Sequence, residues 1–331
     1  MLSDELAVAL YEHMVLAREL DERLVALQRE GRVTQHASAA GEEAAIVGAA
    51  AAMFDNDWLF VGQREGAAAL WRGIPLLAFA HRAFGSAEDI GKGRDAPGPP
   101  FSRSARVASA SPVLGTQIPH AVGVAWAARL RHADVATLVF FGDGETSSGD
   151  FHTGLNFAGV TKAPVVALCR NNGWATTTPV SRQTASAGFA SKAVAYGLRG
   201  VCVDGTDVIA VLTVVREARA RASSGLGGTL VEALTTQLPP GAPTDAVEGD
   251  KVRSGRDPIV RMRRYLELRA LWSDQREQRL RVEARADVHR ALAEAEAADK
   301  PARWKLFDDV YEQMPWHLRE QREMLGTGTE T

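Results

Sequence analysis

The sequence has 331 residues, enough for one large α/β domain with appendages or for two small domains. Hydrophobic residues make up 46% of it, which supports a large core, and a formal net charge of -3 gives no sign of binding to nucleic acid or to an acidic membrane surface. The longest apolar run, residues 44–54, is too short to cross a bilayer, and acidic residues near the N-terminus argue against a secretory signal peptide.

Hydrophobic spacing predicts an amphipathic helix over residues 3–28. A second helix opens at Gly41-Glu42-Glu43, and its small apolar residues are typical of a helix buried against close neighbours. Residues 58–61 are predicted to form a strand that turns into a third helix. In residues 91–112 the composition shifts to Gly, Pro, Ser and Arg without periodicity, which predicts a long surface loop.

The central stretch of the chain follows a predicted helix over residues 118–130. Residues 137–141 read as a buried strand, Gly142-Asp143-Gly144 as the sharp turn out of it, and Ser148 or Asp150 as the cap of the next helix. The pattern repeats, with residues 164–169 as a strand and residues 170–173 as its polar end. Two neighbouring strands would thus bring a carboxylate, an amide and a guanidinium to one sheet edge, where open α/β folds bind ligands.

Strands and helices continue to alternate after this stretch, which predicts a parallel sheet with right-handed crossovers. The expected elements are helices over 189–196 and 208–221, strands over 200–203 and 229–236, a mobile loop over 237–258, and helices over 259–271, 273–298 and 306–325. Trp316 is expected to be an apolar anchor of the last helical segment. The Arg/Glu alternation in residues 276–290 favours a solvated helix face over a partner interface. We expect an α/β domain over residues 1–256 and a C-terminal helical extension over residues 257–331.

The two cysteines, Cys169 and Cys202, lie in apolar strand-like runs. Such positions favour buried free thiols in a reducing compartment over a disulfide. We therefore expect a soluble protein of the cytoplasm.

The polar residues of the central stretch suit a diphosphate held through a divalent cation. Asp143 and Asn172 offer a charged and a neutral oxygen ligand, and a backbone carbonyl near Trp174 would add a third. Glycine N–H groups and a fork donor such as Arg170 would meet phosphate oxygens. The alternative is that these residues form two ordinary tight turns. A nucleotide site is a further alternative, but the chain has neither a GxGxxG turn opening a helix nor a GxxxxGK[ST] loop.

Several motifs together resemble one family. Gly142-Asp143-Gly144 with Asn171-Asn172 looks like the thiamine-diphosphate motif, and the surrounding sequence is similar to the α subunit of the E1 component of 2-oxo acid dehydrogenase complexes. The similar segments include Gly149-Asp150-Phe151-His152, Lys162-Ala163-Pro164-Val165-Val166, Pro179-Val180-Ser181-Arg182-Gln183-Thr184 and Val203-Asp204-Gly205-Thr206-Asp207-Val208. The resemblance extends over residues from about 16 to 325, and it implies a thiamine-diphosphate-binding fold in which 91–112 and 237–258 are active-site loops.

The resemblance also implies roles for single residues. Mg²⁺ would be held by Asp143, Asn172 and the carbonyl of Trp174. Thiamine diphosphate would be held by Arg64, Ser111, Val113, Gly142, Gly144, Glu145 and Arg170. For Arg64, a salt bridge with Glu65 or another acid is the alternative that the residues alone favour.

The implied activity is the oxidative decarboxylation of a 2-oxo acid, pyruvate or a branched-chain acid, with acyl transfer to the lipoyl domain of an E2 acyltransferase. The carboxylate that activates the cofactor would come from a separate β subunit, which implies an α2β2 heterotetramer.

Departures from the family pattern occur at Gln35, His36, Gln63, Pro99 and about Gly241, positions that would face the substrate or gate the site. One hypothesis is an active enzyme with a more polar pocket, in which His36 and Gln63 are the catalytic candidates. The other is a cofactor-binding relative with weak or no turnover. We favour the first, because drift toward inactivity should not spare the metal ligands selectively. For His36 taken alone, simple solvation of a loop histidine is the interpretation that the sequence favours over catalysis.

Overall fold

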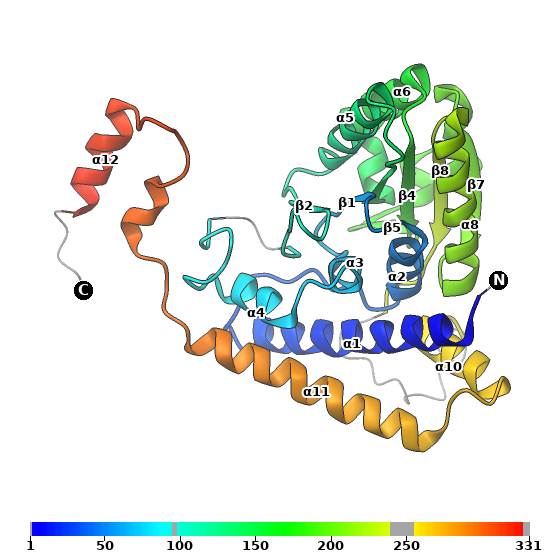
Figure 1. The fold of residues 1–331 in the computed structure, drawn as a ribbon, viewed down its shortest axis with the longest axis horizontal. Coiled ribbons are helices and arrows are strands. Elements are labelled where there is room, and N and C mark those ends of the chain that lie inside the picture. Colours follow the sequence, from blue (N-terminus) through cyan, green and yellow to red (C-terminus); the bar gives the residue numbers. More distant parts are fainter. Residues whose placement is uncertain (1, 95–97, 239–254, 327–331) are drawn as a thin grey trace.

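A six-stranded parallel sheet lies at the centre of the molecule (Figure 1). The computed structural model describes residues 2–94, 98–238 and 255–326. The strand order is β2-β1-β3-β4-β8-β7, with β1 at Trp58–Phe60, β2 at Val107–Ala108, β3 at Thr137–Gly142, β4 at Val165–Asn171, β7 at Arg199–Asp204 and β8 at Thr229–Leu234. This architecture confirms the predicted α/β class.

The central strands are buried on both faces. In β3, Leu138 and Phe140 join one hydrophobic core, whereas Val139 and Phe141 join a second core. Strands covered on both sides have continuous apolar runs, because neither face meets water. This burial explains the continuous apolar runs from which β3 and β4 are predicted.

Two sets of helices cover the sheet. The first core includes residues of α1 (Asp4–Arg29), α2 (Glu43–Ala52), α3 (Gly66–Trp71), α4 (Leu76–Phe84) and α8 (Val208–Arg221), and of two C-terminal helices, α10 (Pro258–Leu268) and α11 (Asp274–Ala297). The second core includes residues of α5 (Gln117–Leu130), α6 (Gly149–Thr161) and the 3₁₀ helix η2 (Ala190–Tyr196). Ser148 caps α6 by accepting a hydrogen bond from the Phe151 N–H at 3.2 Å, so one of the two predicted caps is confirmed.

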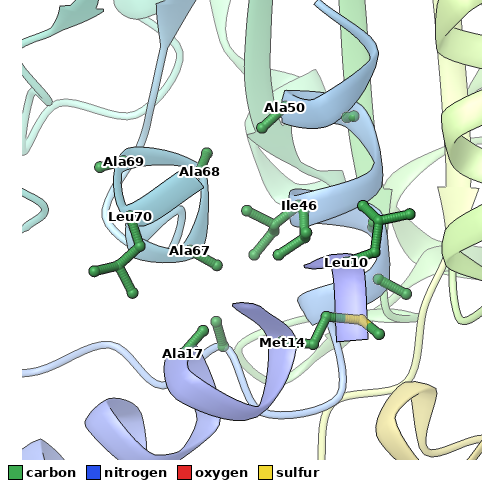
Figure 2. Close-up of a cluster of buried hydrophobic side chains, with 14 of the residues drawn as sticks. Leu10, Met14, Ala17, Ile46, Ala50, Ala67, Ala68, Ala69 and Leu70 are labelled. Carbon is green, nitrogen blue, oxygen red and sulfur yellow. The ribbon is translucent and has the colours of Figure 1, made fainter. Parts of the chain in front are cut away.

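Small residues allow the helices of the first core to approach closely. Figure 2 shows Leu10, Met14 and Ala17 of α1, Ile46 of α2 and the alanines of α3 in one cluster. A Cβ atom at Gly48 of α2 would lie 2.8 Å from the Val208 carbonyl oxygen, so α2 and α8 can pack at this distance only around a glycine. The prediction that the second helix is buried against close neighbours is confirmed.

The C-terminal segment consists of helices, as expected. It contains α10 (Pro258–Leu268), α11 (Asp274–Ala297), the 3₁₀ helix η4 (Arg303–Phe307) and α12 (Trp316–Gly326). Figure 1 shows α11 running along α1 and α4, and α12 at the end of an extended arm. Arg281 and Arg285 of α11 pair with Glu19 of α1, so the predicted solvated face is in part a packing face. Trp316 is 71% exposed, so the predicted apolar anchor is wrong within this chain.

Other expectations need correction. The 91–112 segment contains a strand, β2, which pairs with β1. Asp143 begins the 3₁₀ helix η1 (Asp143–Ser147) instead of a simple turn, and β4 continues to Asn171, so Arg170 lies within the strand. Cys169 is buried and Cys202 is exposed, and both are free thiols.

Two further points concern the limits of the described chain. Most of the predicted 237–258 loop, with Gly241, lies outside the described residues. Within the ranges that the structure describes, no helix combines the length and apolar character needed to span a membrane.

Candidate active site

The carboxyl ends of β3 and β4 bring the central polar residues to one sheet edge. Gly142 at the end of β3 is in register with Arg170 of β4, and therefore Asp143 and Asn172 both follow immediately beyond this pair of neighbouring strands. Asp143 is 3% exposed, and its Oδ2 accepts a hydrogen bond from Gln183 Nε2 at 2.8 Å. Burial raises the pKa of Asp143, and the nearby charge of Glu42 adds to this, against the opposing effect of its hydrogen bonds.

The expected second and third metal ligands lie beside each other. Asn172 Oδ1 accepts a hydrogen bond from the Trp174 N–H at 3.1 Å, and Asn172 Nδ2 donates to Glu42 Oε1 at 3.1 Å. Trp174 begins a short strand, β5 (Trp174–Ala175), which pairs with β6 (Thr178–Pro179). In the described part of the chain, no group of three or more His, Cys, Asp and Glu side chains is placed to hold a metal ion. A cation here would therefore depend on the Asn172 amide and on a backbone carbonyl as well as on Asp143.

Arg170 lies in a buried cluster of acidic side chains. Its guanidinium forms ion pairs with Glu42 and Glu65, and all three side chains are almost fully buried. Burial works to lower the pKa of Arg170, but the charges of Glu42, Glu65 and Glu145 outweigh it and raise this pKa above its ordinary value. Glu65 therefore pairs with Arg170 and not with its neighbour Arg64.

Glu145 ties η1 to the start of α5. Its carboxylate accepts hydrogen bonds from the N–H groups of Gly142 and Gly115, both at 2.9 Å, and from Gln117 Nε2 at 2.7 Å. A Cβ atom at Gly144 would lie 2.7 Å from Ala175 Cβ, so a glycine is required where β5 crosses η1. These contacts fix the Gly142-Asp143-Gly144 backbone against its surroundings.

The edge of the sheet retains unpaired polar atoms that fit a polar ligand. Arg170 Nε and Gln183 Oε1 are buried, and neither has a hydrogen-bond partner in the described parts of the chain. Buried polar atoms in native structures nearly always have partners. A donor and an acceptor left open beside Asp143 and Asn172 are consistent with a diphosphate and its cation at this edge.

The altered positions come together in a cavity of about 430 Å³. Its wall includes Gln35, His36, Gln63, Arg64 and Pro99, whereas none of Asp143, Asn172 and Arg170 is among its described lining residues. A second cavity of about 410 Å³ shares His36 and Arg64 with the first and also contacts Gln237. Since Asn172 Nδ2 lies 3.3 Å from Gln237 Oε1, the second cavity adjoins the sheet edge.

Two of the candidates in this wall have defined contacts. Arg64 Nη1 donates to the Ser38 carbonyl oxygen at 3.0 Å, and within the described chain this side chain forms no ion pair. His36 Nε2 lies 2.8 Å from Asp21 Oδ1, and Asp21 Oδ2 accepts from Ser38 Oγ at 2.6 Å. The half-buried His36 is thus oriented by a carboxylate and is more than a solvated loop residue.

Ser111 and Val113 lie on the exposed loop before α5. Ser111 Oγ accepts from the Val113 N–H at 3.1 Å, and the Val113 side chain is exposed. The structure therefore presents this segment at the surface, near the Gly115 contact with Glu145.

Three residues at the sheet edge were not predicted from the sequence, namely Glu42, Glu65 and Gln183. An acid within an apolar helix start, as at Glu42, was the available signal, because a buried acid needs a partner.

Comparison with known proteins identifies the family of this chain. The model of the family "Dehydrogenase E1 component" matches residues 11–303, which include the sheet and both candidate regions. The chain belongs to the dehydrogenase E1 component family. Membership implies thiamine diphosphate as the cofactor of this E1 chain.

Relatives of this E1 chain are similar over almost its whole length. The 2-oxoisovalerate dehydrogenase subunit alpha 2 of Arabidopsis thaliana, a mitochondrial protein, is 39% identical over 96% of this chain and 69% of its own. The mitochondrial 2-oxoisovalerate dehydrogenase subunit alpha of Bos taurus is 36% identical over 100% of this chain and 74% of its own. The pyruvate dehydrogenase E1 component subunit alpha of Staphylococcus aureus is 36% identical over 98% and 87%, respectively.

Proposed function

We propose that this protein is the α subunit of the E1 component of a 2-oxo acid dehydrogenase complex. It would catalyse the oxidative decarboxylation of pyruvate or a branched-chain 2-oxo acid and pass the acyl group to the lipoyl domain of E2. The observation that carries the proposal is the placement of Asp143 and Asn172 at the ends of neighbouring parallel strands in an E1-family chain. The weak-turnover alternative is not favoured, because the relatives are named as dehydrogenase subunits and the altered positions line a formed cavity.

The chain's own residues suit a diphosphate bound through Mg²⁺. Asp143, Asn172 and the Trp174 carbonyl would hold the cation, since oxygen ligands are those that Mg²⁺ prefers. Arg64 has guanidinium N–H groups left over after its bond to Ser38 and would bind phosphate. Bound thiamine diphosphate supplies the electron sink that the loss of CO₂ requires.

The proposed partners are a β subunit, in an α2β2 heterotetramer, and the lipoyl domain of E2. The relatives' names as alpha subunits support this proposal. The exposed apolar side chains of the C-terminal arm, residues 303–326, support it as well. We propose the cytoplasm as the compartment, in line with the two free thiols, although the plant and bovine relatives are mitochondrial. Immunolocalisation or cell fractionation would test this assignment.

The decisive experiment is an assay of the chain co-purified with its cognate β subunit. With thiamine diphosphate, Mg²⁺ and an artificial electron acceptor, we expect decarboxylation of at least one of pyruvate, 2-oxoisovalerate and 2-oxobutyrate. The Asp143→Ala variant should lose Mg²⁺-dependent cofactor binding, whereas Glu283→Ala, at an exposed position of α11, should retain it. The absence of turnover with every acid, or full cofactor affinity in Asp143→Ala, would overturn the proposal.

A further inference from the structure

Gln183 lies at the sheet edge and has an unusual set of contacts. It ends the short helix α7 (Val180–Gln183), directly after β6. Its Nε2 donates both to Asp143 Oδ2 at 2.8 Å and to the Thr178 carbonyl oxygen at 3.0 Å. One amide nitrogen thus joins the carboxylate that follows β3 to the β5–β6 hairpin.

The orientation of this amide is determined by its neighbours. A carbonyl oxygen can only accept a hydrogen bond, and so can an ionised carboxylate. If the Gln183 amide were turned over, Oε1 would face two acceptors and both hydrogen bonds would be lost. The nitrogen must therefore face Asp143 and Thr178, and Oε1 must point away from them.

This orientation leaves Gln183 Oε1 without a partner among the residues that the structure describes. The atom is buried, and no described protein group donates a hydrogen bond to it. An unsatisfied buried acceptor next to Asp143 calls for a donor that the protein alone does not provide. A cation that keeps part of its water shell, as Mg²⁺ does in proteins, brings such donors.

We infer that Gln183 is a positioning residue of the cation site. It orients the Asp143 carboxylate through Nε2, and its Oε1 accepts a hydrogen bond from water carried by the bound divalent cation. Carboxylates that bind metals are held by hydrogen bonds of this kind, and the loss of such a contact weakens metal binding. The inference rests on the proposed function, because it takes Asp143 as a cation ligand.

The test uses the complex of this chain with its β subunit and three variants of the chain. Gln183→Leu keeps the size of the side chain and removes its polar atoms, whereas Gln183→Glu places a second carboxylate beside Asp143. Gln278→Leu makes the same chemical change at an exposed position of α11 and is the matched control. Apparent Mg²⁺ affinity is measured at fixed thiamine diphosphate by calorimetry and by intrinsic tryptophan fluorescence.

We expect the Mg²⁺ affinity to fall by about tenfold or more in Gln183→Leu and to stay unchanged in Gln278→Leu. In Gln183→Glu the Mg²⁺ affinity should instead rise, because a bound cation relieves the repulsion between two adjacent carboxylates. Saturating Mg²⁺ should restore cofactor binding in Gln183→Leu, which a general structural defect would not allow. An unchanged Mg²⁺ requirement in both Gln183 variants would overturn the inference, as would a loss that saturating Mg²⁺ fails to restore. If the unmodified complex shows no Mg²⁺-dependent cofactor binding, the proposed function fails first and the inference fails with it.

Discussion

Two arginines to which the sequence assigns the same phosphate-binding role have different surroundings. Arg170 is buried between Glu42 and Glu65, whereas Arg64 is half-buried and donates to one carbonyl oxygen. A buried guanidinium between two carboxylates stabilises the folded protein, because removing it leaves two buried negative charges unpaired. Arg64 carries no such structural role in the described chain.

Matched substitutions should separate these roles. Arg170→Met is expected to lower the free energy of unfolding by about 3–5 kcal/mol, since Glu42 and Glu65 lose their counter-ion. Arg64→Met should change it by less than about 1 kcal/mol and instead weaken thiamine-diphosphate binding. Urea unfolding and cofactor titration of the two variants are the measurements. Equal stability of the variants would contradict the structural role of Arg170.

Among the helices, α11 is joined to α1 by the buried Glu277 carboxylate as well as by the ion pairs of Glu19. Glu277 accepts hydrogen bonds from Tyr11 Oη at 2.7 Å, Trp272 Nε1 at 2.9 Å and Arg281 Nε at 2.6 Å. Burial raises the pKa of Glu277, but the hydrogen bonds from these three side chains outweigh it and hold the pKa below its ordinary value of 4.5. The attachment of α11 is therefore linked to pH.

This linkage has a definite sign. A carboxyl whose pKa is lowered by folding stabilises the protein above its ordinary pKa, and that contribution disappears as the pH falls below about 4.5 and through the lowered pKa. Glu277→Gln should therefore cost about 1–3 kcal/mol at neutral pH and less in acid. Thermal and urea unfolding between neutral and acid pH measure the difference in free energy of unfolding between the unmodified protein and Glu277→Gln. A difference that does not change with pH would show that the charge of Glu277 does not contribute to stability.

On the scale of the whole molecule, the C-terminal arm, residues 303–326 of the described chain, contacts Lys92 and Arg94, which form ion pairs with Asp309. Figure 1 shows α12 apart from the sheet and its covering helices. The arm exposes many large apolar side chains, namely Trp304, Leu306, Val310, Tyr311, Trp316, Met324 and Leu325. Large apolar surface on one segment indicates a contact with a partner. In the proposed heterotetramer, that partner is another subunit.

Deletion of residues 303–331 tests this interpretation. The sheet and both cores should remain folded, because residues 303–326, the described part of the deleted segment, contribute no member of either core. Association with the β subunit should weaken, as measured by analytical ultracentrifugation. Deletion from residue 274 onward is the contrasting variant, and it should destabilise the chain because α11 covers α1 and α4. An intact heterotetramer after the shorter deletion would contradict the role of the arm.

By itself, the sequence determined the parallel α/β architecture and the two polar ends that follow β3 and β4. These features depend on local patterns: strands buried on both faces have continuous apolar runs, and helices have caps and a regular apolar spacing. The motifs around Asp143 and Asn172 also identified the family that the comparison confirmed.

Only the tertiary structure decided which side chains meet. Glu42, which directly precedes α2, reaches Arg170 across 128 positions of the sequence, and no local pattern specifies that pair. No local pattern specifies the cavity lined by Gln35, Gln63 and Pro99 either. The same is true of the hydrogen bond from the Gln183 amide to the Asp143 carboxylate. Periodicity reports whether a residue faces a core, but the partner of a buried charge is set by how distant elements pack together.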